Sequence, residues 1–218
     1  MDALRGRWRA DCADAAPAAD PATVDEVGAD LLRRWREPHR TYHDLTHLRE
    51  VLSAVDVLCS AEGLGDDVRT VAALAAWFHD AVYHVTAPEG NEAASSDLAM
   101  AALTRLGAPA SVSARVATLV LDTASHDLGD DAVDPARIVV HDADLWVLSA
   151  PLARFDEYCQ EVREEYAHVP STTYASARAA VLRPFLVRPH VYRSAHARVE
   201  WEPAARENLA RELMRLAG

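Results

Sequence analysis

The chain has 218 residues, half of them hydrophobic, and a formal net charge of −12. Its 22 basic residues are all arginines, and a protein this acidic lacks the basic surface that binding to nucleic acid requires. The three cysteines lie far apart without a CxxC pair, which indicates neither a disulfide framework nor a zinc ribbon. No apolar stretch reaches membrane-spanning length and no signal-type segment opens the chain, so we expect a soluble cytoplasmic protein that binds no membrane.

Alanine and leucine are frequent, glycine is scarce, and the alternation typical of strands is hard to find. These features predict an all-α fold, with one domain over residues 1–218 and roughly eight to ten helices. We expect a poorly specified lead-in over residues 1–20, a capping box at Thr23, and a cap at Thr41 before the second helix. The expected helices cover about Thr23–Glu37, Leu48–Ala61, Asp66–Phe78, Asn91–Leu106, Ala110–Thr123, Pro135–Leu148, Pro151–Tyr166, Ser171–Leu186 (broken by Pro184 and Pro189) and Pro203–Leu216, with an acidic loop over Asp127–Asp134.

The most unusual local feature is the dipeptide His79-Asp80, which ends the almost wholly apolar run Val71–Phe78. A helix this apolar is buried on most sides, so its polar end needs partners. A divalent metal ion is one such partner, and a hydrogen-bond network is another. The rest of the chain supplies further residues of the same kinds, namely His43, His47, Asp142 and Asp144.

A mixed nitrogen and oxygen site would form if His47, His79 and Asp80 met one of the two downstream aspartates. Such a set suits Mn²⁺, Fe²⁺, Co²⁺, Ni²⁺ or Zn²⁺, and suits Ca²⁺ or Mg²⁺ less well. Asp142 and Asp144 do not share a helix face, so one of them is the better ligand. Residue types alone leave a second explanation open, in which the histidines are hydrogen-bonded to nearby carboxylates.

The order His47, His79-Asp80 and Asp144 resembles the H…HD…D signature of the HD superfamily of metal-dependent phosphohydrolases. Longer stretches are similar to a bacterial group of predicted metal-dependent HD phosphohydrolases, namely YHDLTHL, AAWFHDAVY, NEAASSDLA, TASH, HDADLWVL and REEY…Y…R…FLVR. The resemblance covers most of the chain and implies a single all-α HD domain with its ligands on central helices. It also implies that Asp144, rather than Asp142, is the last ligand.

A second resemblance concerns Tyr42-His43 and His47, which are similar to the YHNxxH motif of cyclic-nucleotide phosphodiesterases, distant members of the same superfamily. In those enzymes the second histidine binds metal and the first donates a proton to the leaving oxygen, which implies that role for His43. Asp44 stands here in place of the asparagine. The alternative is that His43 only supports the start of the helix that carries His47.

Five further residues are candidates for a second metal ion or for the substrate: His84, Glu92, His126, Arg163 and Arg178. Two-metal members of the superfamily add histidines between the HD pair and the last aspartate, where this chain has Glu92 and His126, so one and two ions both stay open. His84 either lines the site or lies on the surface. Arg163 and Arg178 resemble family positions and could bind phosphate as charged forks, or could pair with glutamates on helix surfaces.

The expected activity is that of a divalent-metal-dependent phosphohydrolase, which cleaves a small-molecule phosphate ester with a nucleotide as the leading candidate. Metal-activated water would attack, Asp80 or Asp144 would accept its proton, and His43 would protonate the leaving group. Two alternatives stay open: a catalytically silent HD domain that senses a nucleotide or a partner, and an HD-type oxygenase with two irons. The sequence does not fix the oligomeric state, and a homodimer is compatible with it.

Overall fold

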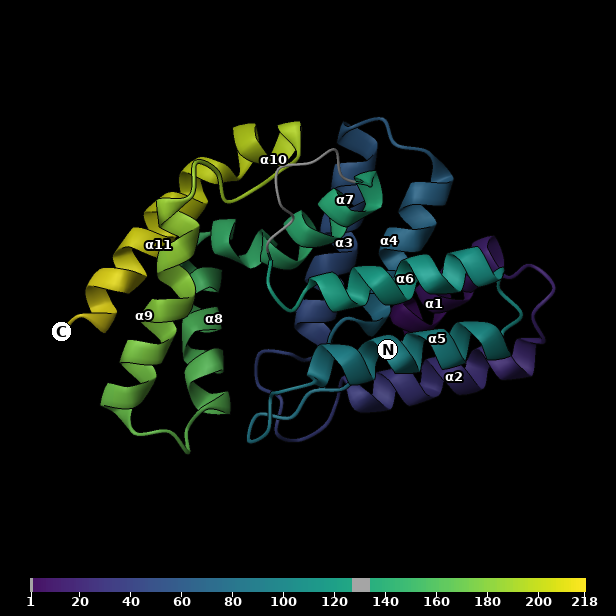
Figure 1. Ribbon diagram of the computed structural model, residues 1–218, viewed down its shortest axis with the longest axis horizontal. Helices are drawn as coiled ribbons and strands as arrows, with labels where there is room; N and C mark the ends of the chain where they lie inside the picture. The colour runs from purple at the N-terminus through teal and green to yellow at the C-terminus, as the bar shows by residue number, and fades with distance from the viewer. Residues whose placement is uncertain (1, 127–133) are drawn as a thin grey trace.

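The computed structural model describes residues 2–126 and 134–218, and all regular structure over these residues is helical, as the sequence predicts (Figure 1). These described residues form eleven α-helices and one short 3₁₀-helix. The number exceeds the expected eight to ten because two helices were not predicted, one near the N-terminus and one before the last helix. The helices are α1 (Asp2–Ala15), α2 (Pro21–Arg34), α3 (Leu45–Ala61), α4 (Asp66–Phe78), α5 (Asn91–Arg105), α6 (Ala110–Asp122), α7 (Pro135–Asp144), η1 (Leu145–Ser149), α8 (Leu152–Glu165), α9 (Ser171–Val187), α10 (Ala195–Glu200) and α11 (Glu202–Leu216). Nearly all of the predicted acidic loop lies outside the described residues. Among the helices that are described, none combines the length and apolarity needed to cross a membrane.

The N-terminal segment is not the poorly specified lead-in that its mixed composition suggested, because it folds as helix α1. Leu4, Trp8 and Cys12 recur at helical spacing and are buried. The Trp8 ring meets Trp77 of α4 edge-on at 5.4 Å between centroids, and its Nε1 donates to the Val24 carbonyl at 2.8 Å. One buried tryptophan therefore holds α1 against both α2 and α4, a contribution that composition does not reveal.

Two helix starts differ from the sequence prediction, because aspartates rather than threonines cap them. Asp20 accepts from the backbone N–H of Thr23 at 3.0 Å, and Asp44 accepts from that of Thr46 at 2.6 Å. A short carboxylate reaches the second or third N–H of a helix well, which makes aspartate a strong cap. As a result His43 precedes α3 while His47 lies in its first turn, so the two do not share a helix. Pro184, expected to break a helix, lies inside α9.

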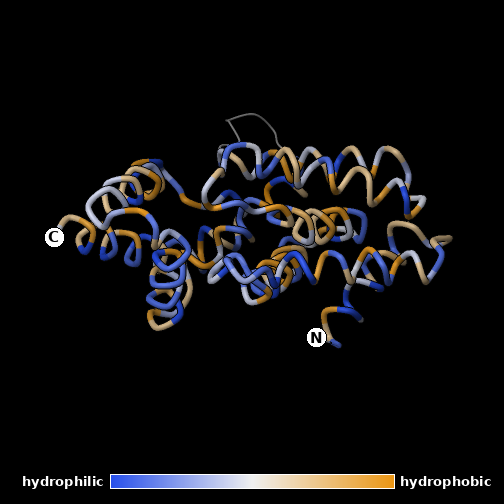
Figure 2. Tube along the Cα trace, turned by 90° about the horizontal axis from the view of Figure 1, so that it is seen from below, coloured by the Kyte–Doolittle hydropathy of each residue, from blue (hydrophilic) through white to orange (hydrophobic). Residues whose placement is uncertain are grey.

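Helix α4 is the centre of the molecule. Every residue from Val71 to Phe78 is buried, and the helix packs against α1, α3, α6 and α7. Figure 1 shows α8, α9 and α11 grouped on one side of α7 and η1, with α1, α2, α5 and α6 on the other. In Figure 2 hydrophilic and hydrophobic segments alternate along the outer helices, as expected when each turns one face inward. The polar end of α4 thus lies deep inside the fold.

The contact between α1 and α2 predicts opposite effects for two glycine substitutions. A Cβ at Gly28 would lie 2.4 Å from Cδ1 of Trp8, whereas a Cβ at Gly6 would meet nothing within 4 Å. We expect Gly28→Ala to lower the free energy of unfolding by about 1–3 kcal/mol through overpacking. Gly6→Ala, the matched control in α1, should raise it by roughly 0.5–1 kcal/mol through helix propensity. Urea unfolding measures both, and similar effects at the two positions would contradict the described packing.

Candidate metal centre

Three distant segments bring two imidazoles and two carboxylates together at the polar end of α4. Nε2 of His47 lies 3.1 Å from Nε2 of His79, and each lies close to Oδ1 of Asp144, at 3.3 and 3.4 Å. Oδ2 of Asp80 lies 3.2 Å from Nε2 of His79 and 3.8 Å from Nε2 of His47. All four residues proposed as ligands from the sequence therefore converge, one from α3, two from the end of α4 and one from the end of α7.

The arrangement can accommodate a cation. Nδ1 of His79 lies 2.8 Å from the Ala76 carbonyl, to which it donates, so in the neutral ring the lone pair is on Nε2, which faces a second ring nitrogen. Two ligands of one ion with bonds of about 2.1 Å lie about 3.0–3.4 Å apart, close to the separations observed. His47, His79 and Asp80 could hold a metal ion, because their donor atoms lie within 4.8 Å of one another.

The electrostatics of the cluster also favour positive charge at its centre. Burial lowers the pKa of His79, but the negative charges of Asp80 and Asp144 outweigh burial and raise it well above its ordinary value. Burial raises the pKa of Asp144, yet His79 and His47 hold it well below its ordinary value. Two ionised carboxylates thus surround a buried space that requires a cation, whether a proton on an imidazole or a metal ion.

Arg40, which the sequence interpretation did not single out, joins the two turns that carry the cluster. Its fully buried guanidinium donates to the carbonyls of His43 at 3.0 Å, Asp80 at 2.7 Å and Ala81 at 3.3 Å. Glu37 provides its counter-charge at 3.2 Å. The turn before α3 and the turn after α4 are therefore fixed relative to each other by one cation.

His43 lies beside the cluster and is oriented by Glu165 of α8. Its Nδ1 is 2.7 Å from Oε2 of Glu165, and its ring stacks on Tyr83 with centroids 4.1 Å apart. The other ring nitrogen, Nε2, is 4.0 Å from Oδ2 of Asp80 and faces the cluster. Glu165 also accepts from Tyr83 Oη and, through Oε1, from the three consecutive backbone N–H groups of residues 41–43 at 2.8 to 2.9 Å. The sequence interpretation missed Glu165, whose role arises only in the folded chain.

Asp142 and Asp144 have separate surroundings. Asp142 is buried and accepts from the backbone N–H groups of Arg193 and Ser194, from Ser194 Oγ, and from His141 Nδ1. These bonds occupy its carboxylate in holding the segment before α10. Asp144 is the aspartate that faces the histidine pair, which agrees with the residue selected by the resemblance.

The five further candidates divide into two groups. His126 lies 3.8 Å from Oδ2 of Asp144 through its Nε2, and it lines the cavity described below together with Glu92 and Arg178. The side chain of His84 is exposed and lies outside the cavity lining. Arg163 also lies outside it, because its guanidinium donates to the carbonyls of Tyr166 at 2.6 Å and Val169 at 3.0 Å.

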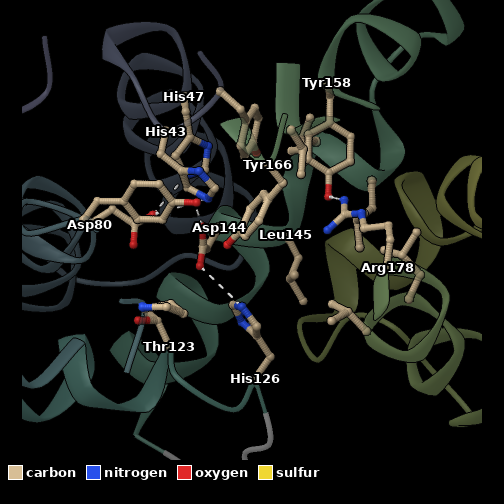
Figure 3. A pocket seen from close by; sticks show the side chains of 18 of the residues that line it. His43, His47, Asp80, Thr123, His126, Asp144, Leu145, Tyr158, Tyr166 and Arg178 are labelled. Carbon is tan, nitrogen blue, oxygen red and sulfur yellow. Dashed lines mark hydrogen bonds and ion pairs between the residues drawn. The ribbon is translucent and has the colours of Figure 1, made fainter. Parts of the chain in front are cut away.

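A cavity of about 380 Å³ opens from the cluster towards α8 and α9 (Figure 3). This volume lies in the range of small-molecule sites. One end is lined by His43, His47, Asp80, His126 and Asp144, and the other by Arg178 and apolar side chains of η1, α8 and α9. Five of the six tyrosines of the chain line it: Tyr42, Tyr83, Tyr158, Tyr166 and Tyr174. The cavity therefore combines a charged end with a wall of aromatic and aliphatic side chains.

Comparison with known proteins adds no family assignment to this geometry. No family model, no curated protein and no solved structure matches the chain.

The Glu165 network predicts a defined pH dependence of stability. Burial raises the pKa of Glu165, but the hydrogen bonds and charge of His43 and the backbone N–H groups outweigh burial and lower it to about 2 from 4.5. Because the folded pKa is depressed, the unfolded chain binds more protons, and this stabilisation is lost as pH falls from about 4.5 towards 2. We expect the gap in unfolding free energy between the wild type and Glu165→Gln to shrink over that range by up to about 3 kcal/mol.

Urea unfolding of both proteins between pH 3 and pH 7 measures this gap, and about 2 kcal/mol of the change should be seen above pH 3. Glu164→Gln is the matched control, because Glu164 is exposed on the same helix and also carries one negative charge. A gap for Glu165→Gln that does not change with pH would contradict the described network.

Proposed function

We propose that this chain is a divalent-metal-dependent phosphohydrolase of the HD superfamily. The observation that carries the proposal is the convergence of His47, His79, Asp80 and Asp144 at one end of a cavity of about 380 Å³. Their order in the chain resembles the ligand signature of that superfamily. The all-helical fold and the position of the cluster at the end of a central buried helix agree with such a protein.

The donor set supports Mn²⁺, Fe²⁺, Co²⁺, Ni²⁺ or Zn²⁺ as the resident ion, with Mg²⁺ a weaker match, because two imidazoles accompany two carboxylates. A second ion would use Asp144 and His126, which lie 3.8 Å apart, with Glu92 lining the same cavity. When bound, a divalent ion supplies Lewis-acid chemistry, since it lowers the pKa of water and polarises a phosphoryl oxygen.

His43 is suited to protonate the leaving group. Ionised Glu165 holds the proton on Nδ1 at 2.7 Å, which fixes the ring and leaves Nε2 to exchange a proton with a substrate oxygen. Asp80 lies between this nitrogen and the histidine pair and can accept the proton of the attacking water. Acid and base would thus be two different side chains, with His43 Nε2 and Asp80 Oδ2 4.0 Å apart.

The wall of the cavity supports a small phosphate ester with an apolar or aromatic body. Tyrosine rings and aliphatic side chains form most of it, and Arg178 is its cationic member. A nucleotide combines a phosphate with a planar base and a volume of this order, which keeps it the leading candidate.

Removal of one ligand tests the metal site. We expect His79→Ala to lower the affinity for Mn²⁺ by more than about tenfold, and to abolish the rise in melting temperature that Mn²⁺ gives to the wild type. Elemental analysis after metal loading and dialysis measures occupancy. His84→Ala removes an exposed histidine and should retain wild-type metal content. Wild-type occupancy in purified His79→Ala would overturn the assignment.

Acid catalysis by His43 predicts a loss that depends on the leaving group. His43→Ala should retain metal and lose roughly a hundredfold to ten-thousandfold in turnover of an alkyl phosphate, whose leaving oxygen needs a proton. The loss on p-nitrophenyl phosphate should be much smaller, because that leaving group is a weak base. Phosphate release from both substrates is the measurement, with His84→Ala as the control.

Equal losses on the two substrates would instead indicate that His43 supports binding or the geometry of the site. Absence of phosphate release from a panel of nucleotides and simple esters by the metal-loaded wild type would favour the catalytically silent sensor. Two bound irons with a visible absorption band would favour the oxygenase.

A further inference from the structure

Within residues 2–126 and 134–218, the Arg178 side chain of α9 has no carboxylate partner. Among the described residues its hydrogen-bond acceptor is Tyr158 Oη, and the guanidinium also lies 5.1 Å from the centroid of the Tyr158 ring. Its Nε is buried and has no hydrogen-bond partner. Glu212, whose charge acts on Tyr158 and Tyr174, has both carboxylate oxygens bound by Arg215. A phenol is a weak acceptor for this half-buried guanidinium, and a charge partly removed from water without a counter-charge is costly.

Tyr174 repeats the same pattern one helical turn earlier. It is buried, lines the cavity with Arg178, and its hydroxyl has no hydrogen-bond partner within the described part of the chain. Residues four apart on a helix share a face, so these two polar groups belong to one region of the cavity wall. A buried donor that lacks an acceptor is relieved by a ligand that brings one.

The place of these residues relative to the metal centre limits what they can bind. In Figure 3 Arg178 and Tyr158 lie across the cavity from His43, His47 and Asp80, with Tyr166 and Leu145 in between. The metal-centre end of the cavity carries carboxylates and imidazoles, whereas Arg178 gives the far end a positive charge. A ligand that spans the cavity therefore meets a cationic group at each end when a metal ion is bound.

We propose that Arg178 and Tyr174 form an anion-binding subsite, and that the substrate is a phosphate ester with a second acidic group at the end away from the bond that is cleaved. The tyrosine-lined wall between the two ends fits an apolar or aromatic body. This inference rests on the proposed function only in placing the cleaved phosphate at the metal centre. It narrows the substrate class proposed above, because a nucleoside monophosphate has no acidic group on its base and would leave the subsite unfilled.

Arg163 lies in the same region as Arg178, but the protein itself binds its donors. Its guanidinium donates to two carbonyls, of Tyr166 and Val169, and also to Ser171 Oγ at 3.5 Å, so it fixes the connection between α8 and α9. Two arginines near the same helices thus have different roles, and only Arg178 keeps donors that a ligand can use.

A matched pair of compounds that cannot be hydrolysed tests the subsite. (4-Carboxyphenyl)phosphonate carries an acid at both ends of an aromatic ring, and (4-carbamoylphenyl)phosphonate replaces its carboxylate with a neutral amide. Isothermal titration in the presence of Mn²⁺ should show that the wild type binds the acid roughly tenfold to a hundredfold more tightly than the amide. Arg178→Gln should remove this preference while changing the affinity for the amide less than about threefold.

Arg183→Gln is the matched control, because Arg183 is exposed on α9 and does not line the cavity, and it should keep the full preference. An amine analogue, (4-aminomethylphenyl)phosphonate, should bind the wild type more weakly than the amide does, a comparison that needs no variant to fold. Equal binding of acid and amide by the wild type, or a preference that persists in folded Arg178→Gln, would overturn the proposal.

Hydrolysis is measured separately, as phosphate release from 4-carboxyphenyl phosphate. A preference for the acid without phosphate release would support the subsite and refute the proposed activity. Phosphate release without any preference would do the reverse.

Discussion

The burial of a polar cluster at the end of an apolar helix is the constraint on which the rest of this structure depends. Imidazoles and carboxylates removed from water must be paired, and here they are paired first with one another. His79 is held by the Ala76 carbonyl on one side and meets His47 on the other. The ring of Trp35 packs beside His79 with centroids 5.3 Å apart, and its Nε1 donates to the Trp77 carbonyl at 3.0 Å. Packing and hydrogen bonds therefore fix the positions of both imidazole rings at the inner end of the cavity.

Two charged side chains, Arg40 and Glu165, hold the backbone of the turns on which this cluster depends. Arg40 donates hydrogen bonds to carbonyls of the turn before α3 and of the turn after α4. Glu165 accepts hydrogen bonds from the backbone N–H groups of the turn before α3. Neither turn has enough backbone partners of its own, since neither is helical or paired in a sheet. Each ion thus replaces a missing piece of secondary structure, and together they place His43 beside the cluster without a helix to carry it.

The sequence predicted features that depend on residues near one another in the chain, and it missed those that depend on residues far apart. Composition and periodicity predicted the all-α class and most helices, because those signals are local. The short motifs contained the residues that converge at the end of α4. Helix α1 was missed because its contacts, such as that of Trp8 with Trp77, are made with residues distant in the chain, and Glu165 was missed for the same reason. The sequence suggested Arg163 for phosphate binding, but its guanidinium donates to the carbonyls of Tyr166 and Val169 in the connection between α8 and α9.

The bonds between Glu165 and residues 41–43 also have a consequence for the order in which the protein assembles. The acceptor and the N–H groups are 122 to 124 positions apart in the chain. Contacts of such long range form slowly, after the loop between them has closed. During synthesis α3 and α4 leave the ribosome well before α8, so His43 is made long before its orienting partner Glu165. Docking of α8 is then the step that fixes the His43 ring beside the cluster.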